Sequence, residues 1–271
     1  MNQLLKKMLL ALALIYAALL IFALFLSDGI IFQPHPSSYR DTSEVLKIAA
    51  ASGRHISAFF LPNASAKYTL LVSHGNAEDL GDIRYWLEDL RRTGFAVFAY
   101  DYEGYGTSEG KPGEKAVYED EEAAYDYVVV KLRVPPEQVI VLGRSVGSGP
   151  AVHIATRRPV GALVLQSPFV SAFRVLTRFP LLPFDKFNNG KKIVHVHCPV
   201  LIIHGTADNV IGNWHGERLY VLANEPKSYL WVNGADHNDV ETVGGTAYFK
   251  ALQQFAISLE QLRQPAASVG N

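Results

Sequence analysis

The chain has 271 residues, of which 49% are hydrophobic and 19% are charged, with 25 basic and 26 acidic side chains. This composition is typical of a folded protein with one well-buried domain, and it excludes a largely disordered chain. The near-zero net charge gives no basic field, so we expect no nucleic-acid partner, and the single cysteine, Cys198, excludes an intrachain disulfide.

The N-terminus carries an uncharged apolar segment over residues 8–26, after a short segment (1–7) that contains Lys6 and Lys7. In a helix this run would span roughly 28 Å, close to the hydrocarbon thickness of a bilayer. It is longer than the apolar region of a signal peptide, so an anchor is favoured over a cleaved signal, which would give a secreted protein. The lysines predict a cytoplasmic N-terminus with the body outside, on the periplasmic face in a bacterium.

After the apolar segment, residues 27–43 are expected to form an extended connector with Pro34 and Pro36. A strand-like pattern then runs from residue 44 to 48 and from 56 to 61, with a hairpin turn at Ser52-Gly53. Beyond it, continuous apolar runs typical of buried strands alternate with longer amphipathic stretches typical of helices. The predicted strands are 68–73, 96–100, 139–142, 162–166, 200–204 and 228–232; the predicted helices are 80–92, 114–130, 146–157, 214–222 and 247–262.

This alternation predicts a doubly wound α/β domain over residues 44–264, with a mostly parallel central sheet and helices on both faces. One interval, about 169–198, breaks the rhythm and is rich in apolar residues around Phe179 and Leu181. At the carboxyl ends of the strands, such an insert is expected to act as a small lid or pocket wall. The last residues, 265–271, are expected to be a frayed tail.

A nucleophile motif stands at the centre of this pattern. Gly143-Arg144-Ser145-Val146-Gly147 fits G-x-S-x-G, directly after one predicted strand and at the start of the next predicted helix. In that setting the serine lies on a sharp turn, and glycines without a Cβ let strand and helix pack closely around it. The position therefore predicts Ser145 as a catalytic nucleophile.

A serine hydroxyl needs a base to take its proton, and in this fold the acid and the histidine follow the serine in that order. Asp208 follows the strand predicted at 200–204, and His237 follows the strand predicted at 228–232. We expect His237 to be the general base and Asp208 to orient it. Asp236, next to the histidine, is a poor alternative acid because adjacent residues cannot easily orient each other's side chains.

The developing oxyanion needs preorganised donors. The backbone N–H of Val146 is one expected donor, because it follows the nucleophile. The second is expected from the loop after the third strand, where we predict the backbone N–H of Asn76, with Gly75 allowing the close approach.

Other chemistry is disfavoured. His195-Val196-His197-Cys198 lacks the further ligands that a tetrahedral metal site needs, so we expect neither a metal nor a cofactor. Cys198 is expected to be a small buried hydrophobic residue rather than a rival nucleophile. Tyr100, Tyr102 and Tyr105 are expected to be packing and loop scaffolding.

These motifs resemble those of the α/β-hydrolase domain-containing serine hydrolases, and within them the membrane-anchored group related to eukaryotic protein depalmitoylases. The similarity extends over residues 33–262 and implies the α/β-hydrolase fold and the same nucleophile, acid, base and oxyanion positions. The motifs that carry it are Ser73-His74-Gly75-Asn76, Asp101 to Ser108 with Gly110-Lys111-Pro112, 143–149, 201–208 and 234–239.

Two features depart from that group. The depalmitoylating members share a cysteine-rich, lipidated N-terminus, whereas this chain has no cysteine before Cys198 and an apolar segment instead. This difference argues against a role as a protein depalmitoylase. The base motif reads Gly-Ala-Asp-His, with Asp236 where the group usually has glycine, and we expect only the local turn to change.

The sequence thus predicts a membrane-anchored serine hydrolase that cleaves an ester or thioester with an apolar acyl group through an acyl-serine intermediate. Its expected partners are a small-molecule or lipid-like acyl substrate and the membrane. Two alternatives remain open: a serine peptidase or amidase using the same triad, and a catalytically silent membrane-tethered binding protein.

Overall fold

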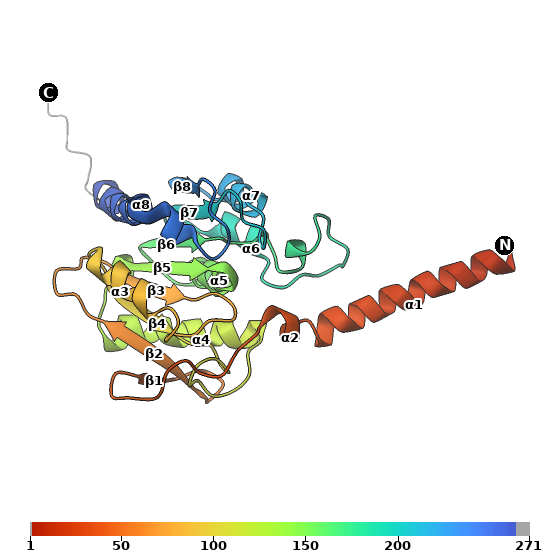
Figure 1. Cartoon of the computed structure of the whole chain (residues 1–271), viewed down its shortest axis with the longest axis horizontal. Coiled ribbons are helices and arrows are strands. Elements are labelled where there is room, and N and C mark those ends of the chain that lie inside the picture. Colours follow the sequence, from red (N-terminus) through yellow and green to blue (C-terminus); the bar gives the residue numbers. More distant parts are fainter. Residues whose placement is uncertain (1, 264–271) are drawn as a thin grey trace, which may run out of the picture.

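Eight strands form one twisted sheet in the order β1-β2-β4-β3-β5-β6-β7-β8 in a computed structural model that describes residues 2–263 (Figure 1). The first two strands and β4 pair antiparallel at one edge, and every other neighbouring pair is parallel. The strands are β1 (Leu46–Ala49), β2 (His55–Leu61), β3 (Thr69–Ser73), β4 (Ala96–Tyr100), β5 (Val139–Arg144), β6 (Ala162–Gln166), β7 (Val200–Gly205) and β8 (Lys227–Val232).

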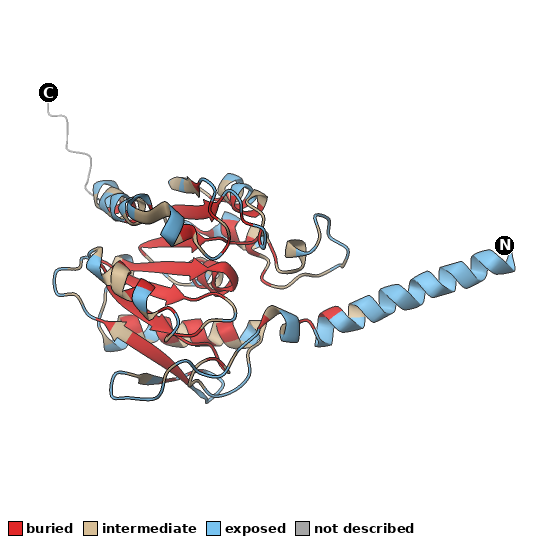
Figure 2. Ribbon diagram, viewed as in Figure 1, coloured by how far each residue is buried: buried red, intermediate tan, exposed pale blue. Residues whose placement is uncertain are grey.

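Helices cover both faces of the sheet. One face packs against α3 (Arg84–Arg92) and α8 (Val240–Arg263), and the other against α4 (Glu114–Asp126), α5 (Ser148–Arg157) and α7 (Trp214–Leu222). Because side chains alternate along a strand, neighbours such as Leu70 and Leu71 enter opposite cores. The continuous apolar runs are therefore explained: the central strands are buried on both faces (Figure 2). The expected doubly wound architecture is present.

Two helices of the α/β domain begin four or more residues away from the start that the sequence pattern predicts. The helix expected from residue 80 starts at Arg84, because the carboxylate of Asp79 accepts from the N–H groups of Gly81 and Asp82 and holds a turn there. The last helix starts at Val240, ahead of the expected 247, and is kinked at Gly245, which has a positive φ of 46°. The glycines at this kink interrupt the hydrophobic periodicity, so the sequence pattern does not predict the first turns of the helix.

The N-terminal apolar segment is a helix, α1 (Gln3–Phe25), which projects away from the body (Figure 1). It is long and apolar enough to cross a membrane, and only 6% of its most apolar window is buried within the structure. A short helix, α2 (Asp28–Ile31), follows in part of the chain where we expected an extended connector. The tail expected over 265–271 lies outside the described residues.

The insert between β6 and β7 contains only short helical turns. These are η4 (Phe173–Val175), α6 (Asn189–Lys192) and η5 (Ile193–His195); the other short elements are η1 (Tyr127–Lys131), η2 (Pro136–Gln138) and η3 (Ser145–Gly147). The side chain of Ser171 donates to Asp185 over 2.6 Å and closes the base of the loop between them. Leu176 and Phe179, within this loop, are exposed.

Candidate active site

Ser145 occupies a strained turn at the end of β5. Its φ of 53° is in the left-handed region, which a serine rarely adopts. The flanking glycines are required by space: a Cβ at Gly143 would lie 2.4 Å from the carbonyl oxygen of Gly147, and one at Gly147 would lie 2.1 Å from that of Ser73. The turn that carries Ser145 therefore packs closely against the end of β3 and the loop that follows it.

Three side chains from separate loops form one hydrogen-bonded chain. The Oγ of Ser145 lies 2.9 Å from Nε2 of His237, and Nδ1 of the same ring lies 2.8 Å from Oδ2 of Asp208. All three side chains are buried. Asp208 follows β7, His237 follows β8 and Ser145 follows β5. Because these strands are parallel, all three residues lie at the same edge of the sheet. The structure thus brings together the three residues that the sequence singles out.

The carboxylate of Asp208 is held on both oxygens. Its Oδ1 accepts from the backbone N–H of Ile211 over 2.7 Å and of Val210 over 3.0 Å. Burial by itself would raise the pKa of this carboxyl, but hydrogen bonds from His204 and His237 outweigh burial and hold the pKa well below its usual range. Asp208 therefore stays ionised beside the imidazole.

Asp236 braces the two loops instead of orienting the histidine. Its carboxylate accepts from the backbone N–H of Asn209 over 2.9 Å and from the side-chain amide over 2.7 Å. Its φ is not positive, so the backbone at this position does not require a glycine. Asp236 therefore bridges the loops of Asp208 and His237.

The loop that carries Asn76 is fixed by tyrosines and by the connector. The side-chain oxygen of Asn76 accepts from the hydroxyl of Tyr105 over 2.7 Å and from the backbone N–H of Gln33 over 2.8 Å. The hydroxyl of Tyr102 donates to the carbonyl of His74 over 2.6 Å. The tyrosines thus hold the loop in place, and Gln33 gave no signal in the sequence.

An apolar pocket of about 400 Å³ opens beside Ser145 and His237. Its walls come from the end of α1, from α2, from the insert and from the loop after Asp208. The residues that line it are Phe22, Ser27, Ile30, Ile31, Gly75, Asn76, Glu78, Arg144, Ser145, Val146, Phe169, Ala172, Phe173, Val175, Leu176, Val210, Ile211, His237 and Asn238. The insert between β6 and β7 contributes one wall. The junction between α1 and α2 contributes another, and the sequence did not indicate this second wall.

A buried charge lies behind the nucleophile. The guanidinium of Arg144 lies 3.6 Å from a carboxylate oxygen of Glu78 and 3.6 Å from one of Glu241. Burial by itself would lower the pKa of Arg144, but these two carboxylates outweigh it and raise the pKa. Glu78 also accepts from the backbone N–H of Gly75 over 2.5 Å. Arg144 therefore links the turn that carries Ser145 to the loop after β3 and to α8.

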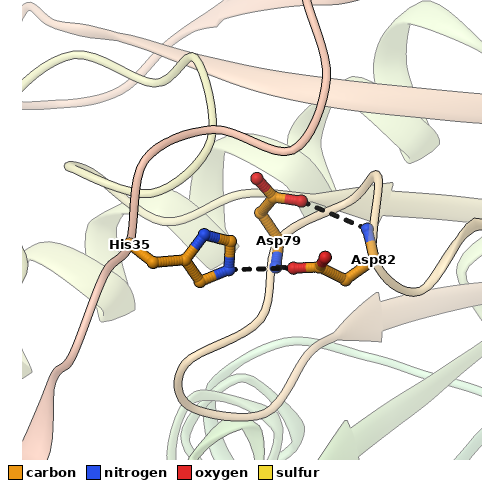
Figure 3. A group of neighbouring side chains, drawn as sticks. All are labelled: His35, Asp79 and Asp82. Atoms are coloured by element: carbon orange, nitrogen blue, oxygen red, sulfur yellow. Dashed lines mark hydrogen bonds and ion pairs between the residues drawn. The ribbon is translucent and has the colours of Figure 1, made fainter.

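Within residues 2–263, the ligand atoms of His35, Asp79 and Asp82 lie within 4.8 Å of one another, a spacing that a metal ion could use (Figure 3). However, both oxygens of Asp79 already accept hydrogen bonds, from the N–H groups of Ser38 and Gly81. Nε2 of His35 lies 2.9 Å from Asp82, and its Nδ1 lies 2.7 Å from the carbonyl of Pro36; these contacts raise the pKa of the imidazole. The group serves as a clamp between connector and domain.

Cys198 is half-buried, and burial raises the pKa of its thiol to about 12. A thiol that stays protonated is a poor nucleophile.

Known proteins share this architecture and much of this sequence. A family model described as serine aminopeptidase, S33, matches residues 64–184. Human alpha/beta hydrolase domain-containing protein 17B is 42% identical over 240 residues, which cover 86% of this chain and 82% of the relative. The mouse 17C protein is 40% identical over 221 residues, covering 79% of this chain and 68% of the relative.

Solved structures agree on the fold. A Pyrococcus furiosus esterase superposes with a TM-score of 0.71 at 20% identity, covering 83% of this chain and 98% of its own. A Paleococcus ferrophilus monoacylglycerol lipase superposes with a TM-score of 0.61 at 22% identity, covering 75% of this chain and 99% of the lipase chain. These likenesses confirm the expected α/β-hydrolase fold, and the relatives confirm the expected group. The chain belongs to the alpha/beta hydrolase domain-containing protein 17 family of serine hydrolases.

Proposed function

We propose that this protein is a membrane-anchored serine hydrolase that cleaves esters or thioesters with an apolar acyl group. The observation that carries the proposal is the hydrogen-bonded chain of Ser145, His237 and Asp208 at the side of an apolar pocket of about 400 Å³. A pocket with such walls favours a hydrocarbon chain, because each buried methylene contributes about 0.8 kcal/mol.

In the proposed reaction, Nε2 of His237 takes the proton of Ser145 as Oγ attacks the acyl carbon. The carbonyl oxygen becomes an oxyanion, which accepts from the backbone N–H groups of Val146 and Asn76. The imidazolium then protonates the departing alcohol or thiol, which leaves an acyl-serine. Water, deprotonated by His237, attacks this ester, and the proton returns to Oγ as the fatty acid leaves. Asp208 stabilises the imidazolium without taking a proton.

The N-terminal helix supports a membrane setting for this site. Helix α1 meets the length and composition of a membrane span, and its last turns supply Phe22 to the pocket wall. Ile30 of α2 lines the same pocket and is itself exposed. The proposed arrangement places the pocket beside the lipid phase, with the N-terminus in the cytoplasm and the catalytic domain on the other side, as the lysines before the helix indicate.

Labelling with a fluorophosphonate probe tests the catalytic assignment. Full-length protein in detergent should label, Ser145→Ala should not, and Ser258→Ala on α8 is the matched control and should label like the wild type. A folded wild-type protein that does not label would instead support the catalytically silent alternative.

A substrate panel tests the specificity. p-Nitrophenyl esters from acetate to decanoate, and the matching thioesters, should give a kcat/KM that rises with acyl length. A preference for acetate over octanoate would overturn the apolar-acyl proposal. The peptidase alternative is raised by the description of the matching family model. Faster turnover of aminoacyl p-nitroanilides than of any ester would support it.

A further inference from the structure

A second imidazole approaches the proposed triad acid and has no part in the reaction described above. His204 lies in β7, four residues before Asp208, and its side chain is fully buried. Its Nε2 lies 3.2 Å from Oδ2 of Asp208 and 2.7 Å from the carbonyl oxygen of Ile211. The ring therefore contacts both the carboxylate and the loop that follows it.

The contacts define which ring nitrogen carries the proton. A carbonyl oxygen only accepts, so the bond to Ile211 requires the proton on Nε2. Nδ1 of His204 is buried and has no hydrogen-bond partner within residues 2–263, and a protonated nitrogen there would be an unsatisfied donor. Helix α7 packs on this side, because a Cβ at Gly216 would lie 2.6 Å from Nδ1. These contacts favour the tautomer with its proton on Nε2 and fix the ring of His204 in one orientation.

The carboxylate of Asp208 is consequently surrounded by donors. Its Oδ1 accepts from two backbone N–H groups, its Oδ2 lies 2.8 Å from Nδ1 of His237, and Nε2 of His204, whose proton goes to the carbonyl of Ile211, lies 3.2 Å from the same Oδ2. The same imidazole closes the loop through the carbonyl of Ile211, whose N–H holds Oδ1. His204 therefore contacts the Asp208 carboxylate at one end of this loop and the carbonyl of Ile211 at the other.

We infer that His204 is a positioning residue that orients the Asp208 carboxylate and limits how strongly Oδ2 attracts the imidazolium of His237. The inference rests on the proposed function, since it assigns Asp208 to the triad. The N–H dipole of His204 has its positive end close to Oδ2 and stabilises the negative charge there, so removal of that dipole leaves Oδ2 to attract a proton on His237 more strongly and favours the protonated form of His237. The groups that face this cluster are His215 on α7, Asp236 beside His237, Glu78 and Arg144 across the pocket, and Arg174 and Arg178 near Trp214.

The test compares two variants of His204 in the full-length protein. His204→Met keeps the volume and removes the donor, whereas His204→Gln can place an amide N–H near the position of Nε2. His153→Met, at a half-buried imidazole outside the site, is the matched control. The readout is the pH profile of kcat/KM for a short p-nitrophenyl ester, in which the acid limb reports protonation of the catalytic base.

We expect His204→Met to move the midpoint of the acid limb to higher pH by roughly half a unit or more, and to lower kcat on the order of ten-fold. His204→Gln should restore the wild-type limb, and His153→Met should leave it in place. A folded His204→Met variant whose limb does not move upward would overturn the inference. A rise in KM for long esters alone would likewise assign His204 only to the shape of the pocket.

A measurement on the wild-type protein avoids any failure of a variant to fold. Ring ¹⁵N NMR of histidine-labelled protein, with the signals of His204 identified by their absence in His204→Gln, should show a proton on Nε2 and none on Nδ1. A proton on Nδ1 would overturn the inference. Loss of the proposed function has a different signature, because in that case the wild type itself shows no ester hydrolysis that depends on Ser145.

Discussion

The Nζ of Lys186, in the insert, lies 2.6 Å from Oδ1 of Asp28, in the helix that follows the apolar segment. The two residues are far apart in the sequence, and the ion pair joins two segments that each contribute residues to the pocket wall. Phe32 and Phe187 meet edge to face beside it, with ring centroids 5.9 Å apart. The ion pair and the ring contact therefore tie the insert to α2.

Breaking this ion pair should affect long substrates most. We expect Lys186→Met to lower kcat/KM for a decanoyl ester a few-fold, because a partly exposed pair contributes about 0.2–1 kcal/mol, and to leave acetyl ester hydrolysis nearly unchanged. The double variant Asp28→Lys with Lys186→Asp restores opposite charges and should recover the long-chain activity. An equal loss on both esters would show that the pair acts on the chemistry and not on the pocket wall.

The two neighbouring acids should differ sharply in their effect on catalysis. Asp208→Asn should lower kcat by about 10⁴, because an amide there favours the wrong tautomer of the base. Asp236→Asn keeps an acceptor for the N–H of Asn209 and should cost less than about ten-fold. Steady-state kinetics on a short ester measure both. A larger loss of kcat for Asp236→Asn than for Asp208→Asn would mean that the acid has been assigned to the wrong residue.

The buried carboxyl of Asp120 should make stability fall as pH rises. Burial raises the pKa of Asp120 from 3.8 to about 8, because one of its oxygens has no partner in the described chain. Between about pH 4 and pH 8 the folded state keeps a proton that the unfolded state releases, so the free energy of unfolding falls by up to about 1.4 kcal/mol per pH unit.

Asp120→Asn removes this dependence and should therefore stabilise the protein more at pH 8 than at pH 5. Urea unfolding of the full-length protein in detergent at both pH values measures the difference. Asp89→Asn, at a half-exposed carboxylate on α3, is the control and should not change it. If Asp120→Asn had the same effect at both pH values, the carboxyl would titrate alike in the folded and unfolded states.

The nucleophile turn should tolerate no side chain at Gly147. A methyl group there would lie 2.1 Å from the carbonyl oxygen of Ser73, so the turn η3 and the end of β3 would have to separate. We expect Gly147→Ala to destabilise the protein by about 1–3 kcal/mol or more and to abolish fluorophosphonate labelling. Gly29→Ala, where no atom lies within 4 Å of the added carbon, should behave like the wild type. Thermal unfolding compares them.

The apolar helix should behave as an anchor with a defined orientation. Removal of residues 2–26 should release the protein from membranes washed with alkaline carbonate, whereas the full chain should stay with them. A C-terminal alkaline phosphatase fusion in a bacterium should be active, because the lysines before the helix favour a cytoplasmic N-terminus. An inactive phosphatase fusion together with a fluorescent C-terminal green fluorescent protein fusion would show that the orientation is opposite to the proposed one.

The sequence by itself determined the order of the elements and predicted which residues carry the chemistry. Ser145, Asp208 and His237 each follow a recognisable apolar run, and parallel strands place their carboxyl ends along one edge of a sheet, so residues after separate strands meet there. The period of the hydrophobic pattern and the residue types that form turns are local properties, so adjacent residues encode them.

Only the tertiary structure decided what surrounds these residues. The contacts of His204 with Asp208, of Arg144 with Glu78 and Glu241, and of Gln33 with Asn76 depend on how loops of unequal length fold back over the sheet. No repeating pattern encodes such contacts. The pocket likewise forms only when the end of α1, the insert and the loop after β7 pack together, because none of these segments encloses a volume alone.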